Sequence, residues 1–266
     1  MPRFDQSRFV KRARADVHVA IASPDLVLVQ VVGAIDDATK MANLAYERLS
    51  EWYGLHFPEF KHADPAKYVQ VALSVDRKNI DEKKLQEIIG QQAQAVIARA
   101  KSSNGVEFSQ EDFDALRAHA EMFFAMHRLL EQLEKYRDGV AQKLCPNISY
   151  VAGPALAAKL VAQAGGISRL ASFPSSTVQV LGAEKALFKH LKTGSPPPKH
   201  GLIFQYPMIS TAPKHARGKL SRALAAKISI AAKADAYSHN FIAEKLKEQF
   251  EKRAKEILDR ENKGKS

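Results

Sequence analysis

The chain has 266 residues, of which 45% are hydrophobic and 26% are charged, a composition typical of folded globular proteins that excludes a disordered chain. Its one cysteine, Cys145, excludes an internal disulfide framework and a cysteine-based zinc finger. The net charge of +11 is uneven, because residues 1–150 hold 20 basic and 21 acidic side chains whereas residues 151–266 hold 20 and 8, so we expect the second half to bind a polyanion.

The first part of the chain predicts a series of helices. Residues 1–22 are basic, and we expect a flexible N-terminus there. Ser23-Pro24-Asp25 is a typical helix start, with a hydroxyl cap, a proline at the first position and a carboxylate near the positive end of the helix dipole. We expect this helix to end at Gly54, a second to begin at Asp64-Pro65, and a third to span residues 81–101.

The longest helical pattern begins at Ser109-Gln-Glu-Asp112 and continues to Lys143. Apolar residues follow a seven-residue register there, with Arg137 as the exception, a pattern typical of a coiled-coil seam of moderate quality: Leu116, Phe123, Leu130 and Leu144. Two long helices separated by short ones predict an antiparallel coiled-coil domain over residues 23–144.

After Pro146 the sequence predicts a globular helical domain over residues 145–258. Short alanine-rich segments are divided by Gly-Pro, Gly-Gly and Phe-Pro breaks, a flexible loop follows at 193–201, and a last long helix or pair of helices spans residues 214–259. We expect one extended segment at 202–206 and a disordered tail at 259–266. The predicted fold class is all-α.

The sequence offers no support for catalysis. It contains no phosphate-binding loop, dinucleotide fingerprint, zinc-protease motif or nucleophile elbow, and its nine histidines are scattered without a carboxylate beside a ligand-spaced pair. We therefore predict a non-enzyme with no metal site and no cofactor. The longest segment free of charged residues, 144–158, is too short to span a membrane, so no membrane partner is expected.

Basic residues from Val151 to Asp235 predict a phosphate-binding surface, since 12 lysines and arginines accompany only two acids there. Three of the lysines recur at helical spacing, which puts three cations on one helix face. His200, in a Gly/Pro loop, is expected to be exposed and able to stack on a base, whereas Phe204 and Tyr206 are expected to pack in the core. The candidate basic residues are Lys185, Lys189, Lys192, Lys199, Lys214, Arg217, Lys219 and Arg222.

Several sequence blocks resemble the Nop-domain proteins, the core proteins of box C/D small ribonucleoproteins that also have a splicing relative. The most specific block is Leu181-Gly-Ala-Glu-Lys-Ala-Leu-Phe-Lys-His-Leu-Lys192, followed by Pro-Pro-Lys-His-Gly-Leu-Ile-Phe. Trp52-Tyr-Gly-Leu-His-Phe-Pro-Glu59 and Gly218-Lys-Leu-Ser-Arg-Ala-Leu-Ala-Ala-Lys227 also match. The resemblance covers roughly residues 24–258.

The resemblance implies a Nop domain that binds a kink-turn RNA, as in a box C/D RNA, together with its small ribosomal-protein-like partner. It places Gly182, Ala183, Glu184 and Lys185 at the junction of RNA and protein, with Lys185 contacting phosphate and Gly182 and Ala183 permitting close approach. Lys189 stands where the family commonly has arginine, and lysine lacks the planar fork needed for bidentate contact. The resemblance further implies self-association through the coiled coil, and therefore a homodimer.

One departure from the family affects the expected partners. Full-length box C/D members carry an N-terminal domain that docks the methyltransferase fibrillarin, whereas only 22 residues precede the first predicted helix here. We therefore expect that fibrillarin is not recruited in the usual way. The expected location is the archaeal cytoplasm, or the nucleolus or nucleus of a eukaryote.

Two alternatives to RNA recognition remain open on the sequence. One is a dimerising protein scaffold whose cationic surface is only solvated. The other is a Nop protein resembling the splicing factor, with no role in guided RNA 2′-O-methylation.

Overall fold

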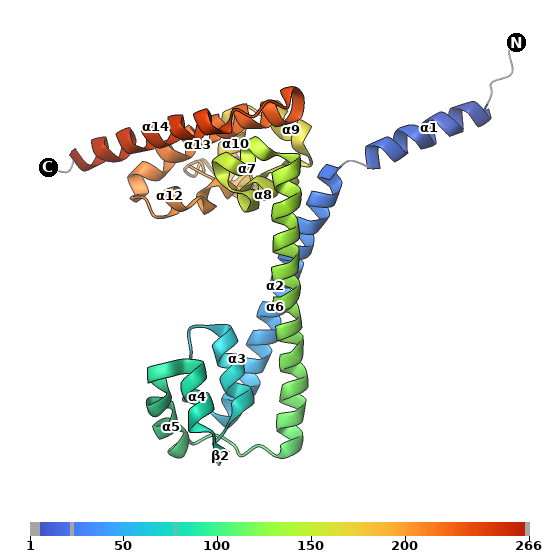
Figure 1. Cartoon of the computed structure of the whole chain (residues 1–266). Coiled ribbons are helices and arrows are strands. Elements are labelled where there is room, and N and C mark those ends of the chain that lie inside the picture. The colour runs from blue at the N-terminus through green and yellow to red at the C-terminus, as the bar shows by residue number, and fades with distance from the viewer. Residues whose placement is uncertain (1–5, 22–23, 78, 264–266) are drawn as a thin grey trace, which may run out of the picture. The chain divides into compact units, whose positions relative to one another are not determined.

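A computed structural model describes residues 6–21, 24–77 and 79–263, and it confirms the all-α prediction (Figure 1). The α-helices are α1 (Gln6–Ile21), α2 (Pro24–His56), α3 (Pro65–Ser74), α4 (Glu82–Ile89), α5 (Ala93–Lys101), α6 (Gln110–Leu144), α7 (Pro146–Ala152), α8 (Pro154–Ala164), α9 (Ile167–Ser172), α10 (Ser175–Val180), α11 (Glu184–Thr193), α12 (Pro207–Ser210), α13 (Lys214–Lys233) and α14 (Ala243–Lys263). Two 3₁₀ segments, η1 (Gly90–Gln92) and η2 (Leu202–Gln205), and a π-helical turn, η3 (Ala234–Ser238), complete the helical elements of the described chain. None of the helices among these residues is both long and apolar enough to cross a membrane.

A two-stranded antiparallel hairpin interrupts the helices between α3 and α4. Strands β1 (Val75–Asp76) and β2 (Asn79–Ile80) pair with Val75 opposite Ile80 and Asp76 opposite Asn79. Two residues a strand are too few to form a sheet with its own core, so the hairpin leaves the fold class unchanged.

The predicted helix limits are partly confirmed. Asp64 caps α3 as expected, because its Oδ1 accepts hydrogen bonds from the amides of Ala66 and Lys67 at 2.9 and 3.3 Å. The helix expected to end at Gly54 is α2, which continues to His56. The expected third helix is broken into α4 and α5 by Gly90, whose φ of +58° lies outside the right-handed helical region. The cap predicted at Ser23 lies outside the described residues.

Three segments differ in secondary structure from the prediction, two of them because local helix propensity prevails. The N-terminus expected to be flexible forms α1 from Gln6 to Ile21, a run free of glycine and proline and rich in good helix formers. The tail expected to be disordered continues α14 to Lys263 for the same reason. The segment 202–206 begins with the 3₁₀ turn η2 and is not extended.

The chain divides into two compact units. Residues 35–132 form one, called the inserted unit here, and residues 1–34 with 133–266 form the other, called the main unit. The domain limits predicted from sequence at 22, 144 and 258 stay a prediction.

The inserted unit has an aromatic core. Tyr53, Phe57, Phe60 and Tyr68 are all at most 5% exposed, and the rings of Phe60 and Tyr68 stack with centroids 4.9 Å apart. The Tyr53 hydroxyl donates to the carbonyl of Val75 at 3.1 Å and the Tyr68 hydroxyl to that of Ser50 at 3.3 Å, so both hydroxyls of the cluster have a hydrogen-bond partner. The Trp52–Glu59 block is thus largely a packing motif.

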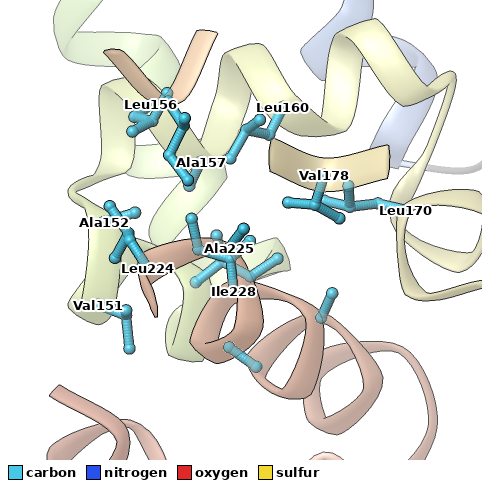
Figure 2. Close-up of a cluster of buried hydrophobic side chains, with 14 of the residues drawn as sticks. Val151, Ala152, Leu156, Ala157, Leu160, Leu170, Val178, Leu224, Ala225 and Ile228 are labelled. Carbon is cyan, nitrogen blue, oxygen red and sulfur yellow. The ribbon is translucent and has the colours of Figure 1, made fainter. Parts of the chain in front are cut away.

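The main unit is built around α13. One side of this helix is buried and mostly apolar, with Ser221 and Ser229 as its polar members, and it packs on α7, α9, α10 and α14. Figure 2 shows Leu224, Ala225 and Ile228 of α13 directed at Val151, Ala152 and other side chains of α7 and α8. Small alanines let these short helices approach closely, and the resulting rigid core carries the basic segments on its surface.

Candidate nucleic-acid interface

The interface begins at the turn that leads into α11. The amide of Gly182 donates to Oε1 of Glu184 at 2.8 Å, and Gln163 of α8 donates its side-chain amide to the same oxygen at 3.2 Å. Partial burial raises the pKa of Glu184, but these hydrogen bonds outweigh it and hold the pKa below its ordinary value. Glu184, predicted as a ligand-binding residue, thus fastens the start of α11 to α8.

Gly182 is required by the protein's own packing. Its φ is +86°, and a Cβ at this position would lie 2.5 Å from Cγ of Leu202. The contact with this side chain of η2 accounts for the glycine within the fold itself, and the close approach of a ligand at Gly182 stays a prediction. Ala183, the next residue, precedes the first turn of α11 and donates its amide to the carbonyl of Val180 at 2.9 Å.

The loop after α11 returns to the segment that precedes it. The amide of Gly201 donates to the carbonyl of Gln179 at 2.9 Å, and the amide of Leu202 donates to that of Leu181 at 2.8 Å. The Gln179 side chain in turn donates to the carbonyl of Lys199 at 2.7 Å. These bonds close the loop, so α11 projects from a fixed base.

The same loop also contacts the start of α13. The aliphatic stem of Lys199 lies over Gly218, at 3.6 Å from the position that a Cβ would occupy there. The His200 ring stacks on Phe204 with centroids 4.5 Å apart and planes 15° from parallel. The Arg217 guanidinium also lies over the Phe204 ring, 5.3 Å from its centre. Three of the predicted residues, Lys199, His200 and Arg217, are thus brought together although the first and the last are 18 positions apart.

His200 is less accessible than predicted. It is half-buried, and burial together with the nearby charges of Arg217 and Lys199 lowers its pKa, which favours the neutral ring. Arg217 is also half-buried, and its Nε donates to the carbonyl of Ala212 at 2.8 Å. Phe204 and Tyr206 pack against the core of the main unit, as predicted.

The exposed face of α11 combines charge with apolar surface. Lys185, Lys189 and Lys192 are all exposed, as their spacing predicted. Phe188 and Leu191, which lie between them, are 61% and 69% exposed, and no side chain of α11 is fully buried. A helix that exposes large apolar side chains among lysines has the surface of an interface rather than that of a solvated helix.

Phe188 and Leu191 were missed by sequence reasoning. Their spacing of three residues would be typical of a helix face packed on a core, and only the structure shows that this face has no covering within the described residues. The sequence signal that could have pointed to these two residues is their position among the three lysines of the same helix.

The remaining basic candidates lie along α13. Lys214 is exposed at its first position, and Lys219 and Arg222 are exposed one and two turns further on. Lys219 and Arg222 do not point into the α11 surface but line a groove between α13 and α14. The structure thus divides the predicted site into two surfaces.

Cys145 is buried at the start of α7, where its side chain is part of the hydrophobic core. Its thiol donates to the carbonyl of Ala141 at 3.2 Å, and burial raises its pKa to about 12. A thiol that stays protonated at neutral pH is a poor nucleophile.

Comparison with known proteins identifies the family. Residues 34–256 match the family described as "Nop: snoRNA binding domain, fibrillarin". The chain belongs to the Nop family. Among similar proteins, an uncharacterised NOP5 family protein of Methanocaldococcus jannaschii is 42% identical over 237 residues, which cover 88% of this chain and 57% of that protein. Human nucleolar protein 56 is 35% identical over 252 residues, covering 91% of this chain and 42% of the relative.

A solved structure shares the Nop fold. The crystal structure of a fibrillarin/Nop5p complex aligns with a TM-score of 0.55 and 24% identity, covering 95% of this chain and 79% of that one. The chain spans about half the length of the curated relatives that it matches.

Proposed function

We propose that this chain is a non-catalytic RNA-binding protein that recognises a kink-turn RNA together with its small kink-turn-binding protein, as in box C/D ribonucleoprotein assembly for guided 2′-O-methylation. The exposed face of α11 carries the proposal. Its three lysines suit phosphates, while Phe188 and Leu191 suit an apolar protein surface. One helix therefore offers both halves of a composite RNA–protein ligand.

The second element is the fixed base of α11. A surface that is ordered before binding loses less conformational freedom when the ligand arrives. The Glu184 bonds and the return of the loop to Gln179 and Leu181 supply that order. Lys199 and His200 continue the surface toward α13.

A gel-shift titration tests this function at two salt concentrations. It uses a kink-turn RNA with and without its small partner protein. We expect weak, salt-sensitive binding to the bare RNA and tight binding to the preformed complex. Lys185→Glu should weaken complex binding by at least about 1–3 kcal/mol, whereas Lys245→Glu, an equal charge change at an exposed site on α14, should have little effect.

A second variant separates the two halves of the surface. Phe188→Ala should weaken binding to the RNA–protein complex while leaving binding to bare RNA unchanged, because it removes apolar contact and no charge. Equal binding of any RNA, with or without the small protein, would contradict composite recognition and reduce the surface to a general cationic one.

The scaffold alternative has one supporting observation in the inserted unit. Met41, Leu44 and Leu55 of α2 are 55–65% exposed, and their spacing puts them on one face of the helix. Light scattering of wild type and Leu44→Glu would test the homodimer: a dimer that the substitution dissociates supports self-association.

The expectation that fibrillarin is not recruited in the usual way stays a prediction, and co-elution of the chain with fibrillarin would contradict it.

A further inference from the structure

An acidic surface with an apolar hollow lies where α7 meets α14 in the main unit. The hollow has a volume of about 620 Å³, and Tyr150 and Ala152 of α7 line it together with Tyr206 and Pro207. A second hollow of about 740 Å³ adjoins it, since Tyr150 and Lys247 line both. The two hollows are together called the acidic surface here, after three carboxylates that line the second: Glu244, Glu248 and Glu251.

The three carboxylates stand out in a strongly basic part of the chain. Residues 151–266 hold only eight acidic side chains, and three of these line this one hollow beside two lysines. Glu244, Glu248 and Glu251 recur at steps of four and three residues, so they lie along one face of α14. All three are exposed, and the ion pairs of the described residues are made by other acids. Their charge is therefore available to a cationic ligand.

An aromatic shelf adjoins the carboxylates. Tyr150 and Phe241 are 45% and 55% exposed, and their rings meet edge to face with centroids 5.6 Å apart. The ammonium group of Lys247 lies 5.0 Å from the centre of the Tyr150 ring, so this ring already holds a cation over its face. Exposed aromatic rings beside acids suit a protein ligand that combines cations with apolar side chains.

Helix α1 has the complementary composition. Every side chain of α1 that the structure describes is exposed. Its apolar residues recur at helical spacing and share one side of the helix: Phe9, Val10, Ala13 and Val17. Lys11, Arg12 and Arg14 are exposed cations, and Asp16 is the one acid in the sequence of the helix. An amphipathic helix of this kind is typical of a segment that seats its apolar face in a groove of another surface.

We propose that the acidic surface binds helix α1 of a second copy of this chain. The apolar side of α1 fills the hollow beside Tyr150 and Tyr206, and its three cations face the carboxylates of Glu244, Glu248 and Glu251. Charge complementarity decides the occupant, because a helix with three exposed cations meets a surface with three exposed acids. When each copy receives the α1 of the other, the two contacts are equivalent and the pair closes with two-fold symmetry.

This contact is separate from the other interactions expected of the chain. It uses no residue of the exposed α11 face and none of the inserted unit. Its test therefore needs no RNA, and its outcome is independent of the homodimer predicted for the coiled coil.

The experiment cross-links the full chain through its lysines. Chains labelled with heavy nitrogen are incubated with unlabelled chains, treated with a short amine-reactive cross-linker, and analysed by mass spectrometry. We expect Lys11 to be joined to Lys245 or Lys247 of the acidic surface, in products that pair a light peptide with a heavy one because two copies contribute. Products formed only within single chains would overturn docking on a second copy, and the absence of these products would overturn the contact itself.

The variant E244Q/E248Q removes two carboxylates and keeps the lysines that react. At concentrations where cross-linking is far from complete, we expect its yield of mixed product to fall about fourfold, since an exposed ion pair contributes about twofold to an association constant. The matched control, E82Q/E87Q, makes the same charge change at exposed positions of α4 and should keep the wild-type yield. Equal loss in both variants would overturn the proposal, because it would show that only total charge matters.

The variant V10A/V17A tests the apolar half of the contact. It removes methyl groups from the apolar side of α1, keeps every charge, and does not lower the helix propensity of the segment. We expect the yield of mixed product to fall at least about fivefold, because less apolar area is buried in the hollow. An unchanged yield would overturn the seating of α1 there.

Discussion

Gly201 lies where the chain leaving the loop passes over the carbonyl group of Leu181. A Cβ at this position would be 2.0 Å from the Leu181 oxygen, a distance that no relaxation of side chains can relieve. Because the amide of the next residue, Leu202, bonds to the same oxygen, the closure of the loop depends on the absence of one methyl group.

We expect Gly201→Ala to lower the free energy of unfolding by about 2 kcal/mol, since the backbone must shift to admit the methyl group. Chemical denaturation followed by circular dichroism would measure the loss. The matched control is Gly139→Ala inside α6, where nothing lies within 4 Å, and there alanine should raise stability by about 0.5–1 kcal/mol through its helix propensity. Equal stability of Gly201→Ala and wild type would contradict the close contact.

His56 is a buried ring in the inserted unit. Its Nδ1 bonds to the carbonyl of Val106 at 2.9 Å, its Nε2 is buried without a partner, and Phe108 and Phe113 lie against the ring. Burial lowers the pKa of His56 more than the Val106 carbonyl raises it. The folded protein thus favours the neutral ring.

The sign of the pH dependence follows from that shift. The unfolded chain takes up a proton on this histidine below about pH 6.5, before the folded protein does, so stability falls as the pH drops through that range toward the lowered pKa. We expect the melting temperature to fall more between pH 7.5 and 5.5 in wild type than in His56→Gln, whose amide can still donate to Val106. The pKa of His200 is also lowered, but this residue is present in both proteins, so its effect on stability cancels in the comparison. Melting temperatures that fall equally with pH in the two proteins would refute the role assigned to His56.

At the scale of elements, α11 has little burial to stabilise it. None of its side chains is fully buried, so it has less of the apolar burial that stabilises most protein helices. At its start the Glu184 carboxylate accepts from Gly182, and at its end the amide of Gly194 donates to the carbonyl of His190 with Gly194 in the left-handed conformation. The hydrogen bonds at the two ends therefore contribute to presenting the lysines in order.

We expect Glu184→Ala to speed amide hydrogen exchange across residues 185–193 by about fivefold, because losing the carboxylate's hydrogen bonds to Gly182 and Gln163 costs about 1 kcal/mol. Glu184→Gln, which keeps an acceptor oxygen, should show a smaller effect. The carboxylate bonds should also weaken as the pH falls through the lowered pKa of Glu184. Unchanged exchange in the alanine variant would show that these bonds do not stabilise α11.

At the scale of the whole molecule, a buried polar network joins segments that are 87–95 residues apart. Oδ1 of Asp235 accepts from the amide and side chain of Asn147 at 3.0 and 2.7 Å, and Oδ2 accepts from the amide of Ile148 at 3.0 Å. Oδ1 of Asn147 accepts from the amide of Ile242 at 2.7 Å. The start of α7 is thereby fixed to η3 and to the approach to α14.

We expect Asp235→Ala to lower the free energy of unfolding by about 3 kcal/mol, because it leaves buried amide donors of α7 without an acceptor. Asp259→Ala, an exposed acid on α14, should change stability by less than about 0.5 kcal/mol. Urea denaturation of both variants would measure the difference. A loss no greater than that of the control would mean that water replaces the carboxylate.

The sequence determined those features that depend on neighbours along the chain. The all-α class, the start of α3 at its Asp64 cap and the exposed lysines of α11 follow from propensity, capping and periodicity, which act over a few residues. The sequence blocks beginning at Trp52 and Leu181 were specific enough to indicate the Nop family, which the match over residues 34–256 shows.

Only the tertiary structure decided which distant groups share a surface. It placed Lys199 against Gly218, turned Arg217 onto Phe204, left Phe188 and Leu191 uncovered, and joined Arg253 to the cations of α13. Exposure and proximity depend on how helices pack, and a helix pattern reads the same whether its apolar face meets a core or a partner. For that reason local sequence located the charges, and packing divided them between the α11 surface and the groove.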